Sequence, residues 1–547
     1  MSRRVAPLAA DYIVVGAGSA GAVVAARLSE DPHVSVLLLE AGPPDSAPQL
    51  HIPAAFTSLF RGAYDWNYDT VPQSHLENRT IFWPRGKTLG GSSSLNAMMW
   101  VRGFAADYDE WAETAGESWS WKSLEHYFRR VERTEDAAHE TQGTDGPQSV
   151  ERQRDPRAHT AAFLDAAREA GHPVTAANLP EGQGFSQTMV SQRRGARAST
   201  ADAYLRPAKD RRNLRVVTGA FVRRVTFAAS SGTSGEEPRA MGVYVEIDGI
   251  TVHAAARHEV ILSGGAVNTP QVLMLSGIGP ADHLAEHGIA LVVDAPGVGS
   301  NLQDHLIAGL APQALGGTLF TGASAPQLAR YLTTRRGMLS SPVAEAYGFV
   351  RTAAAEGAGV PAGLPDVEIL FATAPYVGQG LVRPPDEGLT IAAILLRPRS
   401  RGTIRLASAD PFEKAVIDPG YLTDPEGIDE ATILAGIAEC ERLLDTEALR
   451  AVTTGRWVLP EDGERMTPAE RAELSLRRYS HTIYHPVGTA RMGADAASVV
   501  DPDLRVRGVS GLRVADASVM PTVVRGHTNA AAIVIGEVAA DRIKASR

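Results

Sequence analysis

Two histidine-containing segments near the C-terminal end hold the residues best suited to chemistry. YHPVGTARMG (residues 484–493) sets His485 between a tyrosine and a proline, and RGHTNAAAIV (residues 525–534) places Asn529 at the start of an apolar helical pattern. Histidine, with an unperturbed pKa of about 6.5, can take a hydroxyl proton near neutral pH. Asparagine cannot act as a base, but it can orient an oxygen by hydrogen bonding. This pair suits the activation of a bound alcohol, although a lone histidine in a sequence is usually structural.

The opposite end of the sequence carries a dinucleotide-binding fingerprint. A strand pattern at residues 11–15 runs into GAGSAG (residues 16–21), and a helical pattern and a second strand pattern (residues 34–39) follow, ending at Glu40. The glycines of G-x-G-x-x-G allow a tight turn and close approach of a pyrophosphate to a helix N-terminus, and Glu40 can accept hydrogen bonds from a ribose. An acid there disfavours NADP, but the motif alone does not separate FAD from NAD.

Two more glycine-rich segments predict close approach to a ligand. In GKTLGGSSSLNAMMWVRG (residues 86–103), two glycines precede three serines. No G-x-S-x-G elbow is present, so these serines indicate a polar turn rather than a nucleophile. GAVNTPQVLMLSGIG (residues 265–279) follows a strand pattern and opens a helix. The aromatic-rich residues 43–83 show little periodicity, and we expect them to form a loop over the cofactor or the pocket entrance.

Together these motifs resemble a flavoprotein family. GKTLGGSSSLNAMMWVRG and GAVNTPQVLMLSGIG are similar to the two signatures of the glucose–methanol–choline (GMC) oxidoreductases. The N-terminal fingerprint, YHPVGTARMG, VADASVMP (residues 514–521) and HTNAAAIVIGEVAADRI (residues 527–543) match in the family's order. The resemblance therefore covers nearly the whole chain, and the choline dehydrogenase and choline oxidase branch looks nearest.

The predicted fold class is an α/β composite. Strand-like segments within residues 306–482 have connections too short for βαβ units, which favours an antiparallel sheet. The resemblance implies a Rossmann-type FAD-binding domain and a substrate domain with a large antiparallel sheet flanked by helices. Residues 214–227 indicate a hairpin-like strand pair. We assign residues 1–153, 195–305 and 483–547 to the FAD-binding domain, and residues 154–194 and 306–482 to the substrate-binding domain.

The resemblance also implies a reaction, the FAD-dependent oxidation of an alcohol, preferably primary, to an aldehyde. Hydride passes to flavin N5, His485 is the base and Asn529 positions the substrate oxygen. His481 and His527 are interpreted as structural or supporting residues. The last helix, which begins near Thr528, would stabilise negative charge on the reduced ring. The predicted cofactor-binding residues are Gly16, Gly18, Ser19, Ala20, Gly21, Glu40, Ala41, Trp66, Leu89, Gly91, Asn96, Ala97, Met98, Met99, Val222, Tyr484, Asp516, Ala517, Thr528 and Asn529.

Departures from the family pattern narrow these expectations. Some choline oxidases attach FAD covalently through a histidine in the GGSSS-x-N region, where this chain has Leu95, so we expect non-covalent FAD. DVEILFATAPY (residues 366–376) lacks the histidine expected of a close choline enzyme, so choline is not favoured over another primary or aryl alcohol as the substrate. A quaternary ammonium would need a carboxylate and aromatic faces, for which the candidates are Glu345, Tyr347, Phe371 and Tyr376.

Alternatives remain at this stage. The same scaffold supports hydroxynitrile lyases, in which FAD is only structural, and fatty-acid photodecarboxylases, which need a long apolar tunnel. A non-catalytic flavin-binding sensor is a further class, disfavoured by an intact His485 and Asn529. The electron acceptor can be oxygen or a quinone-type carrier.

Composition limits the partners. The 547 residues, with a net charge of -10, predict two domains or one large unit and argue against nucleic acid. No run approaches the ~20 apolar residues of a membrane span, and no cleaved leader is expected. The single cysteine, Cys440, indicates a buried structural thiol in a cytoplasmic protein, and a homo-oligomer is compatible with the sequence. His283 and His287 lie four apart without an evident third ligand, so no metal site is expected.

Overall fold

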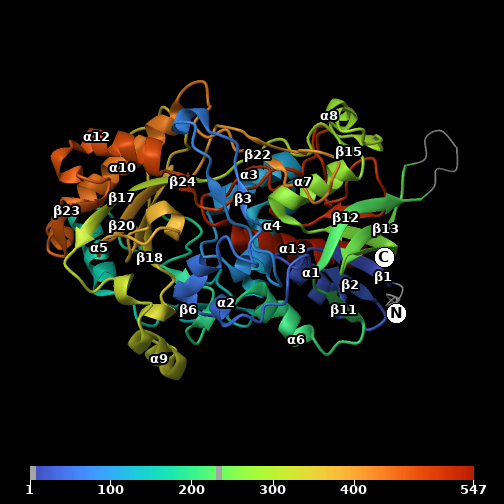
Figure 1. Ribbon diagram of the computed structural model, residues 1–547, viewed down its shortest axis with the longest axis horizontal. Coiled ribbons are helices and arrows are strands. Elements are labelled where there is room, and N and C mark those ends of the chain that lie inside the picture. The colour runs from blue at the N-terminus through green and yellow to red at the C-terminus, as the bar shows by residue number, and fades with distance from the viewer. Residues whose placement is uncertain (1–7, 229–236) are drawn as a thin grey trace.

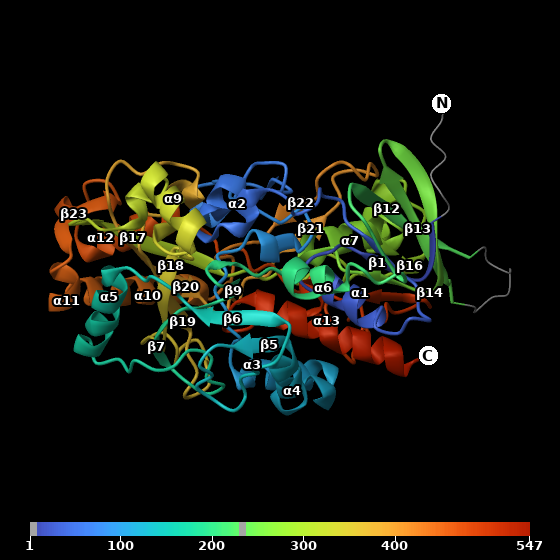
Figure 2. The same cartoon turned by 90° about the horizontal axis from the view of Figure 1, so that it is seen from below.

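The computed structural model describes residues 8–228 and 237–547. Two seven-stranded sheets lie toward opposite ends of an elongated molecule, and helices pack around both (Figures 1 and 2). One sheet is mainly parallel and the other is antiparallel, which confirms the predicted fold class. Residues 1–7, on which part of the leader prediction rests, lie outside the described residues. None of the described helices is both long and apolar enough to span a bilayer.

The first sheet is built around β1 (Leu8–Val15). This strand pairs in parallel with β2 (Val36–Leu39) on one side and with β14 (Ile250–Leu262) on the other, and its second half is completely buried. Beyond β2 the sheet continues with β11 (Leu214–Val217), and β25 (Leu512–Val514) runs parallel to the end of β14. The carboxyl ends of these buried strands therefore meet at one edge, where ligands of parallel sheets bind.

The predicted hairpin at residues 214–227 is not formed. The strand β11 lies at one edge of the sheet, whereas β12 (Ala220–Phe227) lies at the other edge and pairs with β13 (Ala240–Ile247). Between them the chain crosses the end of β2, where Glu40 N donates to Val217 O at 2.9 Å and Ala220 N donates to Glu40 O at 2.8 Å. The prediction was wrong because β11 pairs with β2, which is distant in sequence, while β12 pairs with the strand that follows it, β13.

The second sheet has the order β23–β17–β20–β19–β18–β7, and β24 pairs with the start of β17. Helix α10 (Ile428–Leu444) packs on this sheet and contains Cys440, which is free and buried, as predicted. The strands are β7 (Gly184–Gln187), β17 (Leu306–Ala314), β18 (Ala344–Val350), β19 (Val367–Ala372), β20 (Thr390–Leu395), β23 (Thr453–Leu459) and β24 (His481–Thr482).

Helix α13 (Thr528–Ala545) runs from the middle of the molecule toward the end that holds β1 (Figures 1 and 2). Its Glu537 is fully buried and accepts hydrogen bonds from Arg27 of α1 (Gly21–Leu28), from Arg130 of α4 (Trp121–Val131) and from the hydroxyl of Tyr204. A buried carboxylate is tolerated only when it is paired in this way. These contacts hold α13 against α1 and α4.

The remaining helices and strands lie outside the two seven-stranded sheets. The helices are α2 (Pro48–His51), α3 (Ala105–Ala115), α5 (Ala158–Glu169), α6 (Arg206–Ala208), α7 (Gly265–Leu275), α8 (Ala281–Glu286), α9 (Ala325–Thr334), α11 (Glu447–Arg450) and α12 (Pro468–Leu474). The short strands are β3 (Tyr68–Asp69), β4 (Phe82–Trp83), β5 (Glu132–Thr134), β6 (Gln148–Arg152), β8 (Met189–Val190), β9 (Gln192–Arg193), β10 (Ala196–Arg197), β15 (Ile278–Gly279), β16 (Val293–Asp294), β21 (Thr403–Arg405) and β22 (Val416–Asp418).

Candidate functional site

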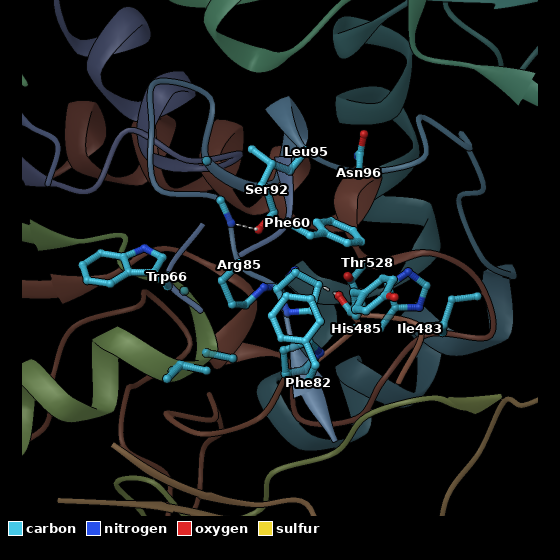
Figure 3. Close-up of a pocket in the computed structure, with 18 of the residues that line it drawn as sticks. Phe60, Trp66, Phe82, Arg85, Ser92, Leu95, Asn96, Ile483, His485 and Thr528 are labelled. Carbon is cyan, nitrogen blue, oxygen red and sulfur yellow. Dashed lines mark hydrogen bonds between the residues drawn. The ribbon is translucent and has the colours of Figure 1, made fainter. Parts of the chain in front are cut away.

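A cavity of about 550 Å³ is lined from both sheets and from the N-terminus of α13. In the view of Figure 3, Trp66 lies at one side of this cavity and His485 and Thr528 lie at the other, with Arg85 and Phe82 between them. Its size falls within the range of about 300–1,000 Å³ usual for cofactor and ligand sites. Every predicted cofactor-binding residue lines the cavity except Gly21 and Leu89.

The three fingerprint glycines are needed for different reasons. A Cβ on Gly16 would lie 2.5 Å from Ser263 O, and a Cβ on Gly21 would lie 2.0 Å from Gly16 O, so both are required by the packing of the turn itself. A Cβ on Gly18 would instead meet no atom closer than Gly91 Cα at 3.9 Å, and Gly18 does not have a positive φ. Among the described residues, the space beside Gly18 is therefore open, and a ligand group such as a phosphate can approach the chain closely there.

Polar groups around this turn also fit a dinucleotide. Glu40 accepts from Ala17 N at 2.9 Å and from Gly42 N at 2.8 Å through different oxygens, so each oxygen retains a lone pair for a ribose hydroxyl. Burial raises the pKa of Glu40 to about 7. Ser263 Oγ is buried on the cavity lining without a partner among the described residues. Glu40 is one of the residues that the sequence predicts for FAD, whereas Ser263 was not predicted.

His485 is held from two sides by the start of β17. Its backbone N donates to Asp304 Oδ1 at 2.8 Å, and its Nδ1 lies 3.0 Å from Nδ1 of His305. Burial lowers the pKa of His485 well below its usual value, and the nearby positive charge of Arg85 lowers it further. The ring is therefore neutral and lines the cavity, as a base for a hydroxyl proton must be.

The side chain next to His485 on the cavity lining is His527 rather than Asn529. The rings of His485 and His527 have centroids 4.8 Å apart, and His527 Nε2 lies 3.2 Å from Glu368 Oε1. Asn529 also lines the cavity, but its Oδ1 accepts a hydrogen bond from Ser19 Oγ at 2.8 Å. No hydrogen bond joins Asn529 to His485 among the described residues. Asn529 thus belongs to the end of the cavity formed by the glycine turn.

The residues considered for a quaternary ammonium do not form such a site. Glu345 is completely buried and accepts hydrogen bonds from Ser341 Oγ, Thr160 Oγ1 and Arg157 N, each at 2.6 Å. Neither Glu345 nor two of its three aromatic companions line the cavity; Tyr376 alone does. The carboxylates on the described lining are Glu40, Asp69 and Asp516.

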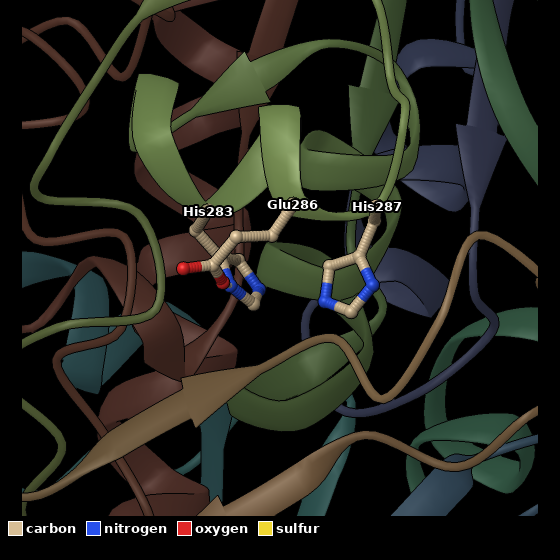
Figure 4. A group of neighbouring side chains, drawn as sticks. All are labelled: His283, Glu286 and His287. Carbon is tan, nitrogen blue, oxygen red and sulfur yellow. Dashed lines mark ion pairs between the residues drawn. The ribbon is translucent and has the colours of Figure 1, made fainter.

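The pair His283 and His287 gains a third potential ligand in the structure, because Glu286 lies beside both (Figure 4). However, Leu406 N donates to His283 Nε2 at 3.0 Å, so a neutral His283 carries its proton on Nδ1, 3.5 Å from Glu286. A metal-bound histidine uses the opposite arrangement, in which the nitrogen away from the metal donates a proton. The cluster is better explained as a hydrogen-bonded anchor of α8.

Comparisons with known proteins point to one family. The GMC oxidoreductase family models match residues 10–307 and 398–536. An uncharacterised GMC-type oxidoreductase of Mycobacterium tuberculosis is 53% identical over 98% of this chain and 99% of its own length. An alcohol dehydrogenase (acceptor) of Pseudomonas putida is 42% identical over 97% of this chain and 95% of its own. The crystal structure of pyridoxine 4-oxidase from Mesorbium loti superposes with a TM-score of 0.86 at 30% identity, covering 98% and 99% of the two chains.

The free space at Gly18 gives a direct test of the dinucleotide site. We expect Gly18→Ala to fold normally but to weaken FAD retention by at least about tenfold, because the added methyl occupies the space for the ligand. FAD release can be followed by the recovery of flavin fluorescence on dilution.

Gly357→Ala is the matched control, because this exposed glycine has no positive φ and its Cβ would make only an ordinary 3.7 Å contact with Ala354 O. Unchanged FAD retention in Gly18→Ala, with both variants folded, would contradict the assignment.

Proposed function

This chain belongs to the GMC oxidoreductase family and is an FAD-dependent oxidoreductase that acts on CH–OH groups, and we propose that it oxidises an uncharged, largely apolar primary alcohol to an aldehyde. The observation that carries this proposal is a neutral, buried His485 on the lining of a cavity whose other end has the features of a dinucleotide site. The alcohol dehydrogenase of Pseudomonas putida, with 42% identity, supports an alcohol as the substrate.

In this proposal both His485 and His527 interact with the substrate oxygen. His485 takes the hydroxyl proton, and bound FAD supplies the acceptor for the hydride that leaves the carbinol carbon. Glu368 fixes one ring nitrogen of His527, which directs the other toward the substrate oxygen. The positioning role that the sequence gives to Asn529 passes to His527, since Asn529 is engaged with Ser19.

The composition of the cavity lining supports an uncharged substrate. Apolar side chains make up most of the lining, and each of its three carboxylates on the described residues lies at the glycine turn or is paired with another group. Glu40 lies at the glycine turn, Asp69 is paired with Arg61, and Asp516 accepts from Gly265 N and Thr269 Oγ1. A quaternary ammonium would need a carboxylate facing it. In this proposal, the wall of the substrate pocket is built from large apolar residues of the cavity lining. These residues are Phe56, Phe60, Phe82, Ile307, Leu310, Val343, Leu370 and Ile483.

We also propose that the FAD is non-covalent and that residues 1–153, 195–305 and 483–547 form its domain. Leu95 lines the cavity where some relatives carry the linking histidine, and a leucine cannot form such a bond. Precipitation of the protein with acid should leave the flavin in the supernatant. A yellow pellet would show a covalent bond to another residue.

Replacement of His485 tests the proposed base. His485→Ala should retain FAD but slow anaerobic flavin reduction by the best alcohol by roughly 10²–10⁴-fold, the usual contribution of a general base. Flavin bleaching in a stopped-flow instrument measures this rate, after a screen of primary aliphatic and aryl alcohols. His481→Ala is the matched control, since His481 is also a histidine on the cavity lining but its ring bonds to its own segment at Thr482 O.

Near-normal reduction in His485→Ala would refute the assignment. If no alcohol bleaches the flavin of the wild-type protein while mandelonitrile is consumed, the lyase alternative holds instead. Admission of air to the reduced wild-type enzyme then separates an oxidase, which reoxidises quickly, from a dehydrogenase that needs a quinone-type acceptor.

The roles of His527 and Asn529 can be separated by paired variants. We expect His527→Ala to lower the rate of flavin reduction by about 10²-fold while FAD remains bound, because the substrate oxygen loses an oriented partner. Asn529→Ala should act mainly on the cofactor, weakening FAD retention through the loss of the bond to Ser19. The reverse pattern, with slow reduction only in Asn529→Ala, would restore the role that the sequence predicts.

A further inference from the structure

A chain of two hydrogen bonds lies behind His485. Nε2 of His305 is 3.0 Å from the carbonyl oxygen of Leu396, and Nδ1 of His305 is 3.0 Å from Nδ1 of His485. His305 is 1% exposed and does not line the cavity, so it does not touch a substrate there. Any effect of His305 on a substrate in the cavity must therefore pass through His485.

The chemistry of these atoms fixes where the protons are. A carbonyl oxygen only accepts, so His305 must donate from Nε2 to Leu396. Burial lowers the pKa of His305 to about 3, so its ring is neutral and its Nδ1 carries no proton. The contact between the two rings can then form only if Nδ1 of His485 donates to Nδ1 of His305.

We propose that His305 is a positioning residue that holds His485 in the Nδ1–H tautomer and so leaves the lone pair of Nε2 free for the substrate hydroxyl. Nε2 makes no hydrogen bond to any residue that the structure describes, and His485 lines the cavity. When the alcohol O–H bond breaks, an Nε2–H bond forms and the oxygen retains the electron pair. The Nδ1–H bond to His305 is unchanged by this step.

The neighbours of His485 support this assignment. Asp304, the residue before His305, accepts from the backbone N of His485, so the carboxylate does not compete for either ring nitrogen. The ring of His305 meets that of His485 edge-on, with centroids 5.2 Å apart and an interplanar angle of 80°. In water a neutral histidine exchanges between two tautomers, and a fixed acceptor at Nδ1 removes that freedom.

Nitrogen NMR of protein labelled with ¹⁵N-histidine tests the tautomer without any turnover. In the resting protein we expect the signals of His485, identified by their loss in His485→Ala, to show a protonated Nδ1 and a bare Nε2. His305→Asn should preserve this pattern, because the asparagine oxygen can take the place of Nδ1 as acceptor. His305→Leu, which offers no acceptor, should give a mixture of tautomers. A protonated Nε2 in neutral wild-type His485 would overturn the proposal.

Flavin reduction by the alcohol of the proposed function gives the kinetic test. His305→Leu should lower this rate about 10- to 100-fold, as loss of an orienting partner commonly does, while His305→Asn keeps most of it. In the His485→Ala background, His305→Leu should have no further effect, because a residue that acts only through His485 has nothing left to orient. Retention of FAD and the thermal midpoint confirm that each variant is folded.

Equal rates in His305→Asn and His305→Leu, or a further loss in the His485→Ala background, would show a general structural role and refute the proposal. This kinetic test rests on the proposed function, whereas the NMR test does not. If no alcohol reduces the wild-type flavin, the proposed function fails while the tautomer still decides the present inference.

Discussion

The site depends on the pairing of the 303–305 segment with the histidine loop. Gln303 forms an antiparallel bridge with Val487, Asp304 accepts from the backbone of His485, and His305 O accepts from Ile483 N at 3.0 Å. These contacts use the polar groups of a loop that is buried, where an unpaired N–H would be costly. Since the 303–305 segment leads directly into β17, this strand of the second sheet fixes the position of His485. The first sheet and α13 hold the dinucleotide end of the same cavity, so the chemistry needs both layers.

This pairing also maintains a strained backbone. Tyr484, immediately before the base, has a φ of 71°, a conformation that costs a bulky residue about 1–3 kcal/mol. Its backbone N donates to Thr482 Oγ1 at 2.7 Å, and Arg85 donates to its carbonyl at 3.1 Å. Thr482 is itself held within β24, and Arg85 lines the cavity. The strain turns the chain sharply, so that the Tyr484 hydroxyl contacts Tyr376 while the next residue meets His305.

Sequence alone could predict what is local and what a family motif marks. The glycine turn, Glu40 and the beginning of α13 near Thr528 depend on neighbouring residues, and the structure has them as predicted. The parts that sequence missed depend on distant partners. His305 precedes His485 by 180 residues, and only folding shows that their rings meet. His527 and Asn529 are two positions apart at a helix start, and their spacing does not reveal which one faces the base. The sequence did contain one signal for His305, because this histidine directly follows Asp304 and directly precedes a strand pattern.

The positions of the cationic groups around His485 decide how easily the proton moves. Burial and the positive charge of Arg85 weaken His485 as the proposed base, yet the same charge would stabilise the alkoxide that forms as the proton leaves. Because the transfer creates a cation on the ring and an anion on the oxygen, a positive group favours it when it lies nearer the oxygen. Arg85 lines the cavity in which the oxygen of the proposed substrate must bind. His305, behind the ring, is kept neutral by its pKa of about 3. Positive charge is therefore placed on the substrate side, and an uncharged acceptor stands behind the base, which is the arrangement that favours proton removal.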